Sequence, residues 1–413
     1  MDVFFMRLSR HVACLSVFLL SVPTILNAAD SGDIAPSVAI PLHYYPEYGV
    51  YTADLKIGKE PAQTVEAIID TGSAVMVIVA DKVYCPSCST AFTKGALDPL
   101  KAGLSLHNNK TVELDYGSAT DTVTEYVGPV RYAANALNQL FMKVFVLKNS
   151  SQPASIVGMI EHNIKGDPIN TTPFIVELTK DFNRYSEITF VLCADKGKSY
   201  YQLGPVKLPP PLVESKLSTS QFYEIATSGF YDENNKPIAK TLKNYGGAIL
   251  DTGTGGFIVL TPRLYKPLYR YIYQHAGKVN QALPKRFWQE NYCVPRKEVD
   301  FTSLPPIKIG IKSMKDNAPY HLTLLPTSYI NRAGCDEGQV RFVFNSSLPP
   351  NFYTAIRNHN ARIMNGAHPE MVIGTALFNQ YAMTIFFKPK DKHHIALYEN
   401  DRLCHINAQK EKQ

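Results

Sequence analysis

The chain has 413 residues, of which 45% are hydrophobic and 19% charged, so it holds ample apolar material for a core. Intrinsic disorder of the bulk of the chain is excluded, because disordered chains combine low hydrophobicity with high net charge. The 42 Lys and Arg residues against 36 Asp and Glu residues give a net charge of +6. This charge is spread thinly along the sequence, so we expect no nucleic-acid partner, which would need clustered basic residues.

Residues 1–29 have the pattern of a secretory signal peptide. Two arginines precede an apolar stretch over residues 12–20, and Ala28 and Ala29 supply small residues for cleavage. An uncleaved membrane anchor is the alternative, but the apolar run is short and is interrupted by Pro23. We therefore expect a protein that is secreted, periplasmic or vacuolar, with no membrane contact once the signal is removed.

One sequence motif occurs twice in the chain. Ala67-Ile-Ile-Asp70-Thr71-Gly72-Ser73 is followed by an apolar run over residues 75–79. Ala248-Ile-Leu-Asp251-Thr252-Gly253-Thr254 is followed by an apolar run over residues 257–260. Each copy predicts a strand, an Asp-opened turn and a second strand. The 181 residues between the two Asp residues favour two similar lobes, because a solenoid would have a much shorter repeat.

Six cysteines remain after removal of the signal: Cys85, Cys88, Cys193, Cys293, Cys335 and Cys404. An even number in an exported chain suggests three disulfides, for which 15 pairings are possible. Cys85-Pro-Ser-Cys88 could instead be half of a zinc site or a redox pair. A zinc site needs a second close Cys/His pair and a redox motif should open a helix, so we favour a small structural loop.

A strand-like segment that ends in Gly follows each Asp, at residues 155–158 and at residues 371–374. Such a Gly lets another backbone approach closely. The intervening segments mostly alternate like half-buried strands, and helical patterns are limited to the following ranges: 174–182, 262–275 and 376–381. Strands are expected at residues 383–387 and 394–398.

The boundary between the lobes is expected in residues 203–212, where four prolines interrupt any strand. We therefore assign residues 30–205 to an N-terminal lobe and residues 206–405 to a C-terminal lobe. Residues 406–413 are expected to form a frayed tail.

The two Asp-Thr-Gly turns suggest catalysis by paired carboxyls. One Asp in a glycine turn is usually only a turn residue, but a pseudo-twofold between the lobes would bring Asp70 and Asp251 together. Like charges about 3 Å apart cannot both ionise, so the pair would share a proton and supply an acid and a base. Such a pair can deprotonate a water towards a carbonyl and protonate the leaving amine. A Gly after each Thr leaves room for backbone N–H groups to reach the carboxylates.

The sequence resembles the pepsin-like aspartic proteases over residues 40–398. This resemblance implies an all-β, bilobal fold with a cleft between the lobes, and a catalytic pair formed by Asp70 and Asp251. It implies that Thr71 and Thr252 bond across the lobes beneath that pair. Active-site support is then expected from the rest of both turns: Gly72, Ser73, Gly253 and Thr254, with Ser73 and Thr254 on the outer carboxylate oxygens.

The same resemblance implies a hairpin flap and a set of disulfides. Leu114-Asp-Tyr116-Gly117-Ser118 looks like the flap tip, whose Tyr closes over the substrate. The implied disulfides are Cys85–Cys88, Cys293–Cys335 and, for the two remaining cysteines, Cys193–Cys404.

The sequence departs from the family pattern at several positions. Val77 occupies the place of a Trp that hydrogen-bonds the flap Tyr, and the only tryptophan, Trp288, lies far away in the sequence. Ala119 replaces the second Gly of the flap tip. Only about ten residues separate the predicted signal from the first family strand, so we expect no long inhibitory prosegment.

The sequence thus predicts a secreted, monomeric aspartic endopeptidase that needs no metal or cofactor and works at acid pH. Its expected partners are extended peptide or protein substrates with hydrophobic residues at the scissile bond, and pepstatin-like inhibitors. The main alternative is a catalytically silent pepsin-like binding or inhibitor protein, and a third is an unrelated lectin-like β-protein. The segment around Gly255 is not a phosphate loop, because a strand rather than a helix is expected after it.

Overall fold

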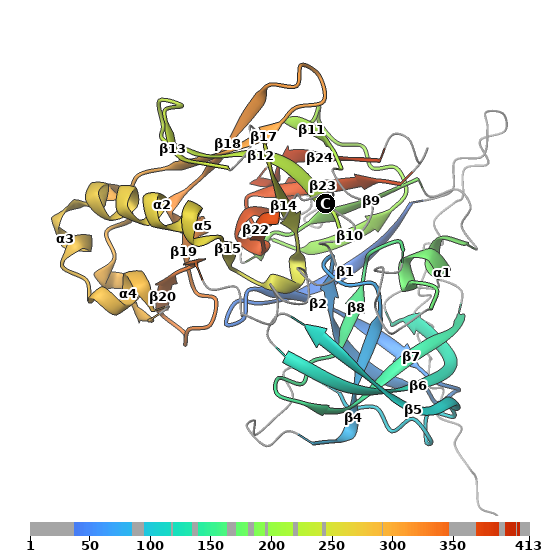
Figure 1. Ribbon diagram of the computed structural model, residues 1–413. Coiled ribbons are helices and arrows are strands. Elements are labelled where there is room, and N and C mark those ends of the chain that lie inside the picture. The colour runs from blue at the N-terminus through green and yellow to red at the C-terminus, as the bar shows by residue number, and fades with distance from the viewer. Residues whose placement is uncertain are drawn as a thin grey trace, which may run out of the picture. The chain divides into compact units, whose positions relative to one another are not determined.

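The computed structural model describes residues 37–404, apart from 85–94, 117–118, 134–138, 163–170, 181–185, 195–196, 218–221, 242–244, 291, 347–368, 388–392 and 402. The predicted signal peptide, the Cys85–Cys88 loop, Gly117, Ser118 and the expected tail therefore lie outside the described residues. The described chain is mainly β-structure (Figure 1), which confirms the expected predominance of strands.

Thirteen strands form the largest sheet. In spatial order they are β11 (Val213–Lys216), β24 (His394–Glu399), β23 (Tyr381–Phe386), β9 (Glu187–Val191), β10 (Ser199–Leu203), β1 (Val38–Tyr45), β2 (Val50–Ile57), β3 (Gln63–Asp70), β8 (Ile156–Gly158), β4 (Met76–Tyr84), β7 (Leu140–Ser150), β6 (Ala119–Tyr132) and β5 (Ser105–Tyr116). The sheet joins distant parts of the chain, since β9 pairs with β23 and places Phe190 opposite Met383.

Two smaller sheets are built from the second half of the chain. The eight-stranded sheet contains β18 (Pro319–Leu324), β17 (Ile307–Lys312), β12 (Glu224–Tyr231), β14 (Gly246–Leu250), β22 (Pro369–Ile373), β15 (Ile258–Leu260) and β21 (Phe344–Asn345), with β13 (Pro237–Lys240) paired to β12. The three-stranded sheet contains β16 (Val294–Pro295), β20 (Gln339–Phe342) and β19 (Ile330–Asn331).

The helices of the described residues are short, apart from α2. They are α1 (Phe174–Lys180), α2 (Pro262–His275), α3 (Gly277–Gln281), α4 (Lys285–Gln289), α5 (Pro326–Tyr329) and α7 (Thr375–Phe378), with 3-10 turns at Thr252–Thr254, Arg296–Glu298 and Phe301–Ser303. The predicted helix at 262–275 is confirmed at both ends. The helix expected over residues 376–381 ends earlier, because Tyr381 already belongs to β23 and its hydroxyl donates to the Thr323 carbonyl at 2.7 Å.

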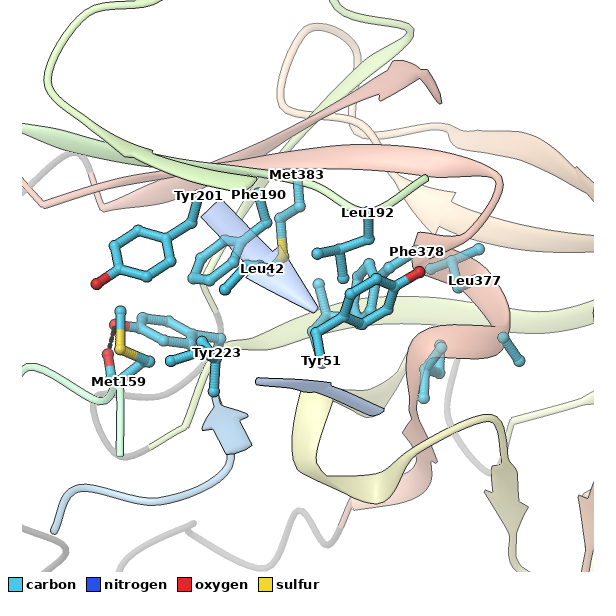
Figure 2. Packing of buried hydrophobic residues seen from close by; sticks show 14 of the residues in the cluster. Leu42, Tyr51, Met159, Phe190, Leu192, Tyr201, Tyr223, Leu377, Phe378 and Met383 are labelled. Carbon is cyan, nitrogen blue, oxygen red and sulfur yellow. Dashed lines mark hydrogen bonds between the residues drawn. The ribbon is translucent and has the colours of Figure 1, made fainter. Parts of the chain in front are cut away.

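Buried aromatic residues fix the strands around the centre of the large sheet (Figure 2). The Tyr201 ring lies 5.9 Å from the Phe190 ring. The hydroxyl of Tyr51 donates to Asn379 Oδ1 at 2.6 Å and accepts from the Ala194 N–H at 2.9 Å. A buried phenol needs such partners, so this residue ties β2 to the segment after α7.

The described residues contain two disulfides, Cys193–Cys404 and Cys293–Cys335. They confirm two of the three expected pairings, and Cys85–Cys88 lies outside the described residues. Disulfides are typical of proteins that fold in an oxidising compartment. Among the described helices, none is long and apolar enough to cross a membrane.

Candidate active site

The two Asp-Thr-Gly turns have the same strand surroundings. In the first, β3 ends at Asp70 and runs parallel to β8, while β4 runs antiparallel to β8 on its other side. In the second, β14 ends just before Asp251 and runs parallel to β22, while β15 runs antiparallel to β22. Strand β8 ends at Gly158, where an added Cβ would lie 2.5 Å from Val75 N. Gly374 follows directly after β22, and an added Cβ there would lie 2.1 Å from Gly255 O. The predicted strand–turn–strand units are therefore confirmed, and both glycines are required by close backbone contact.

The two turns are joined by the side chains of Thr71 and Thr252, which are both buried. The Thr71 N–H donates to Thr252 Oγ1 at 3.1 Å, and the Thr252 N–H donates to Thr71 Oγ1 at 2.9 Å. Each hydroxyl then donates to the strand before the other turn, Thr71 to the Leu250 carbonyl at 2.9 Å and Thr252 to the Ile69 carbonyl at 2.6 Å. The four bonds fix the position of one turn relative to the other.

Replacing Thr252 with Val is expected to lower the free energy of unfolding by about 2–4 kcal/mol. The change leaves the buried Thr71 N–H and Ile69 carbonyl without partners, and an unsatisfied buried group costs about 1–3 kcal/mol. Urea unfolding at pH 5 measures the change. The matched control is Thr111→Val on the exposed side of β5, for which we expect less than about 0.5 kcal/mol. Equal stability of Thr252→Val and wild type would contradict a role for the reciprocal bonds.

Each carboxyl is held by its own turn. Asp70 Oδ1 accepts from the Gly72 N–H at 2.7 Å, and Asp251 Oδ1 accepts from the Gly253 N–H at 2.8 Å. Thr254 Oγ1 also donates to Asp251 Oδ2 at 2.6 Å, as expected for this residue. Only 7% of Asp70 and 9% of Asp251 is exposed to solvent.

The carboxyl of each Asp lies beside the glycine of the opposite turn, in space that a side chain on that glycine would fill. A Cβ on Gly72 would lie 2.6 Å from Asp251 Oδ1, and a Cβ on Gly253 would lie 2.4 Å from Asp70 Oδ1. Each carboxyl therefore packs against the glycine of the opposite turn. Desolvation by burial, then the negative charge of Asp251 and a hydrogen bond with it, raise the pKa of Asp70 well above its ordinary value. The arrangement favours a pair that holds one proton between two carboxyls.

Ser73 plays a weaker role than its counterpart Thr254. Its hydroxyl is buried near Asp70 and opposes the rise of that pKa. It makes no hydrogen bond of full geometry to any residue in the described part of the chain. The two turns are therefore similar but not identical in how they hold the outer carboxylate oxygens.

The expected flap sequence forms a hairpin. Strands β5 and β6 pair antiparallel up to Tyr116 opposite Ala119, and Gly117 and Ser118 between them lie outside the described residues. Beside the hairpin, Val77 is fully buried in an apolar cluster that includes Leu114 and Val123. Trp288 lies elsewhere in the core, where its Nε1–H donates to the Asn280 carbonyl at 3.2 Å.

Asp121 is a buried carboxyl in this hairpin, and no motif in the sequence singles it out. It pairs with Leu114 across the hairpin and with Ser150 on β7, and it is 2% exposed. Its Oδ1 has no hydrogen-bond partner among the described residues. Desolvation raises the pKa of Asp121 to about 6, against a smaller opposing effect of the Ser150 hydroxyl.

Because the folded-state pKa of Asp121 lies above the unfolded value near 4, this group binds more protons in the folded protein between pH 4 and 6. Its contribution to stability is complete at low pH and is lost as the pH rises through about 6. We expect the stability of Asp121→Asn relative to wild type to increase by about 3 kcal/mol from pH 3.5 to pH 7. Urea unfolding at several pH values tests this.

The control for Asp121 is Asp98→Asn. Hydrogen bonds from Lys101 lower the pKa of Asp98, so the wild-type protein gains stability from that group as the pH rises. The stability of Asp98→Asn relative to wild type should therefore decrease, not increase, from pH 3.5 to pH 7. If the stability of Asp121→Asn relative to wild type did not change with pH, the prediction would be contradicted.

Two further sets of contacts at the site were not predictable from sequence motifs. The hydroxyl of the buried Tyr223 donates to the Met159 carbonyl at 2.7 Å (Figure 2), and the Met159 N–H donates to the Asp70 carbonyl at 2.8 Å. The Thr375 hydroxyl bonds to the Gly49 carbonyl, and a Cβ on Gly49 would lie 2.4 Å from Gly256 N. In each set, a segment distant in sequence supports the backbone of one Asp turn.

No protein-family model matches the sequence, and a search of curated proteins finds no significant relative. Within the described residues, no group of three His, Cys, Asp or Glu side chains is placed to hold a metal ion.

Proposed function

We propose that the protein is a secreted aspartic endopeptidase of the pepsin-like type. The observation that carries this proposal is the meeting of Asp70 and Asp251, each held by its own turn and packed against the glycine of the other. The proposal includes a bilobal arrangement in which each lobe supplies one turn. An extended peptide would bind between the lobes beneath the β5–β6 hairpin.

In the proposed reaction, the two carboxyls share one proton and hold a water molecule. The ionised carboxyl takes a proton from the water while the water oxygen bonds to the scissile carbonyl carbon, and the protonated carboxyl gives its proton to the carbonyl oxygen. The C–N bond then breaks as the amine receives a proton from one carboxyl and the other carboxyl takes a proton from a hydroxyl of the tetrahedral intermediate, so no acyl-enzyme forms.

The test is digestion of unfolded casein and of a quenched peptide with apolar residues at its centre, at pH 3–5, with and without pepstatin. We expect cleavage that pepstatin blocks and that declines as the pH rises and the shared proton is lost. Mass spectrometry of the products would identify the residues beside the cleaved bond. Pepstatin binding without any cleavage would instead favour a silent binding protein, and cleavage insensitive to pepstatin would reject the dyad.

A further inference from the structure

The helical segment that follows the second Asp turn carries a concentrated positive charge. Residues 262–297 contain eight basic residues and one acidic residue, Glu290, a net charge of +7 against +6 for the whole chain. The basic residues are Arg263, Lys266, Arg270, Lys278, Lys285, Arg286, Arg296 and Lys297. The expectation that charge is spread thinly along the sequence is therefore wrong for this segment.

The geometry of α2 places its basic residues on the side away from the core. Leu264, Leu268 and Ile272 are the buried residues of the helix. With 3.6 residues per turn, Lys266 and Arg270 project from the opposite side, one turn apart. Both are exposed, as are Lys278 on α3 and Lys285 on α4, and Figure 1 shows these three helices together.

Most of the basic residues on α2, α3 and α4 form no ion pair with an acidic side chain in the described part of the chain. Arg263 pairs with Glu370 at 2.9 Å, whereas Lys266, Arg270, Lys278 and Lys285 form no ion pair within the described part of the chain. Clustered charges of one sign attract polyanions and raise their rate of association.

An aromatic row borders the basic face. The rings of Tyr265 and Tyr269 lie 5.9 Å apart, and those of Tyr269 and Tyr273 lie 6.0 Å apart. Trp288 packs edge-on to Tyr273 at 5.7 Å, which joins α4 to α2. Tyr273 is 36% exposed, so the surface offers an apolar ring beside the cations.

We propose that this basic face of α2–α4 binds an acidic polysaccharide. Lys and Arg form charge-assisted hydrogen bonds with sulfate or carboxylate groups, and exposed tyrosine rings can pack against the faces of sugar rings. A phospholipid surface is a poorer fit, because the disulfides indicate an exported protein and the anionic leaflet of a cell membrane faces the cytoplasm. The proposal is independent of whether the protein cleaves peptides.

The test compares the wild-type protein with two charge-reversal variants. One carries Lys266→Glu, Arg270→Glu and Lys278→Glu. The matched control carries Lys59→Glu, Lys82→Glu and Lys315→Glu, three exposed residues outside α2, α3 and α4. Titration calorimetry measures binding of a heparin oligosaccharide, which bears sulfates, and of a hyaluronan oligosaccharide, which bears only carboxylates. Thermal unfolding checks each variant, and a Gln version of the first triple substitution replaces it if the Glu version does not fold.

We expect wild type and control to bind heparin, with an affinity that falls as salt rises. The α2–α3 variant should bind at least about tenfold more weakly, since three attractive contacts become repulsive. Hyaluronan binding equal to that of heparin would identify carboxylates as sufficient, and weaker binding would identify sulfates. Absence of heparin binding, equal loss in both variants, or tighter binding to phosphatidylserine vesicles or a DNA oligonucleotide would overturn the proposal.

Discussion

Replacing Asp70 or Asp251 with Asn is expected to lower kcat for a peptide substrate by at least about 10³-fold. Acid–base catalysis by one positioned side chain contributes about 10²–10⁴-fold, and here the same pair supplies both the acid and the base. Asn retains an oxygen that can accept from the Gly72 or Gly253 N–H, so the turn should keep its shape. Steady-state kinetics at pH 4 with a quenched peptide measure the effect.

Asp300→Asn is the matched control for these variants. Asp300 caps the 3-10 turn Phe301–Ser303 by accepting from the Thr302 N–H, just as Asp251 caps Thr252–Thr254. The same chemical change at an equivalent cap should leave kcat within about twofold of wild type, because surface changes away from a site have small effects. Activity above a tenth of wild type in Asp70→Asn would contradict the proposed dyad.

The stability of Asp70→Asn should have a pH dependence of its own. The folded-state pKa of Asp70 is raised, so wild type is stabilised by the bound proton at low pH and loses that contribution as the pH rises. Removing the ionisable group should therefore make the variant more stable relative to wild type at pH 7 than at pH 3. Urea unfolding at both pH values gives this difference, and a difference that does not change with pH would argue against a carboxyl forced to share a proton.

The second large effect is expected for Gly253→Ala. The new Cβ would lie 2.4 Å from Asp70 Oδ1 and 2.6 Å from its Cγ, and real Cβ atoms do not approach other atoms so closely. The Asp70 carboxyl must move, although the Gly72 N–H holds it at 2.7 Å. Because a displacement of about 1 Å in a catalytic group can reduce the rate about 10²-fold, we expect at least that loss in kcat, with a smaller change in KM.

Gly338→Ala separates this clash from the general effect of replacing a glycine. Gly338 has a φ of +75°, and an added Cβ would meet nothing within 4 Å. The control should lose about 1 kcal/mol of stability through backbone strain and keep its kcat. The reciprocal change Gly72→Ala, which would press on Asp251, should resemble Gly253→Ala. Full activity in both turn variants would show that the carboxyls are not constrained by the opposite glycines.

Local sequence patterns were sufficient for much of the fold. The apolar runs around both Asp-Thr-Gly motifs predict the strands that flank them. The spacing of apolar residues in Pro262–His275 predicts a helix of the observed length. Both kinds of pattern succeed because strand and helix periodicity depend on neighbouring residues. The two observed disulfides were implied by a family resemblance, since cysteine spacing alone leaves 15 pairings open.

Only the tertiary structure decided which distant groups meet. Neither turn by itself shows that the carboxyl of Asp70 fills the space beside Gly253, or that the carboxyl of Asp251 fills the space beside Gly72. The same is true of Asp121, whose raised pKa results from its burial in the sheet formed by β5, β6 and β7. It is also true of the exposed basic residues on α2, α3 and α4, which lie together in Figure 1. The sequence by itself determined where an acid, a turn or a helix lies along the chain. The packing of segments remote in sequence determined their burial, their partners and hence their proton affinity, because desolvation and charge interactions depend on distance in space.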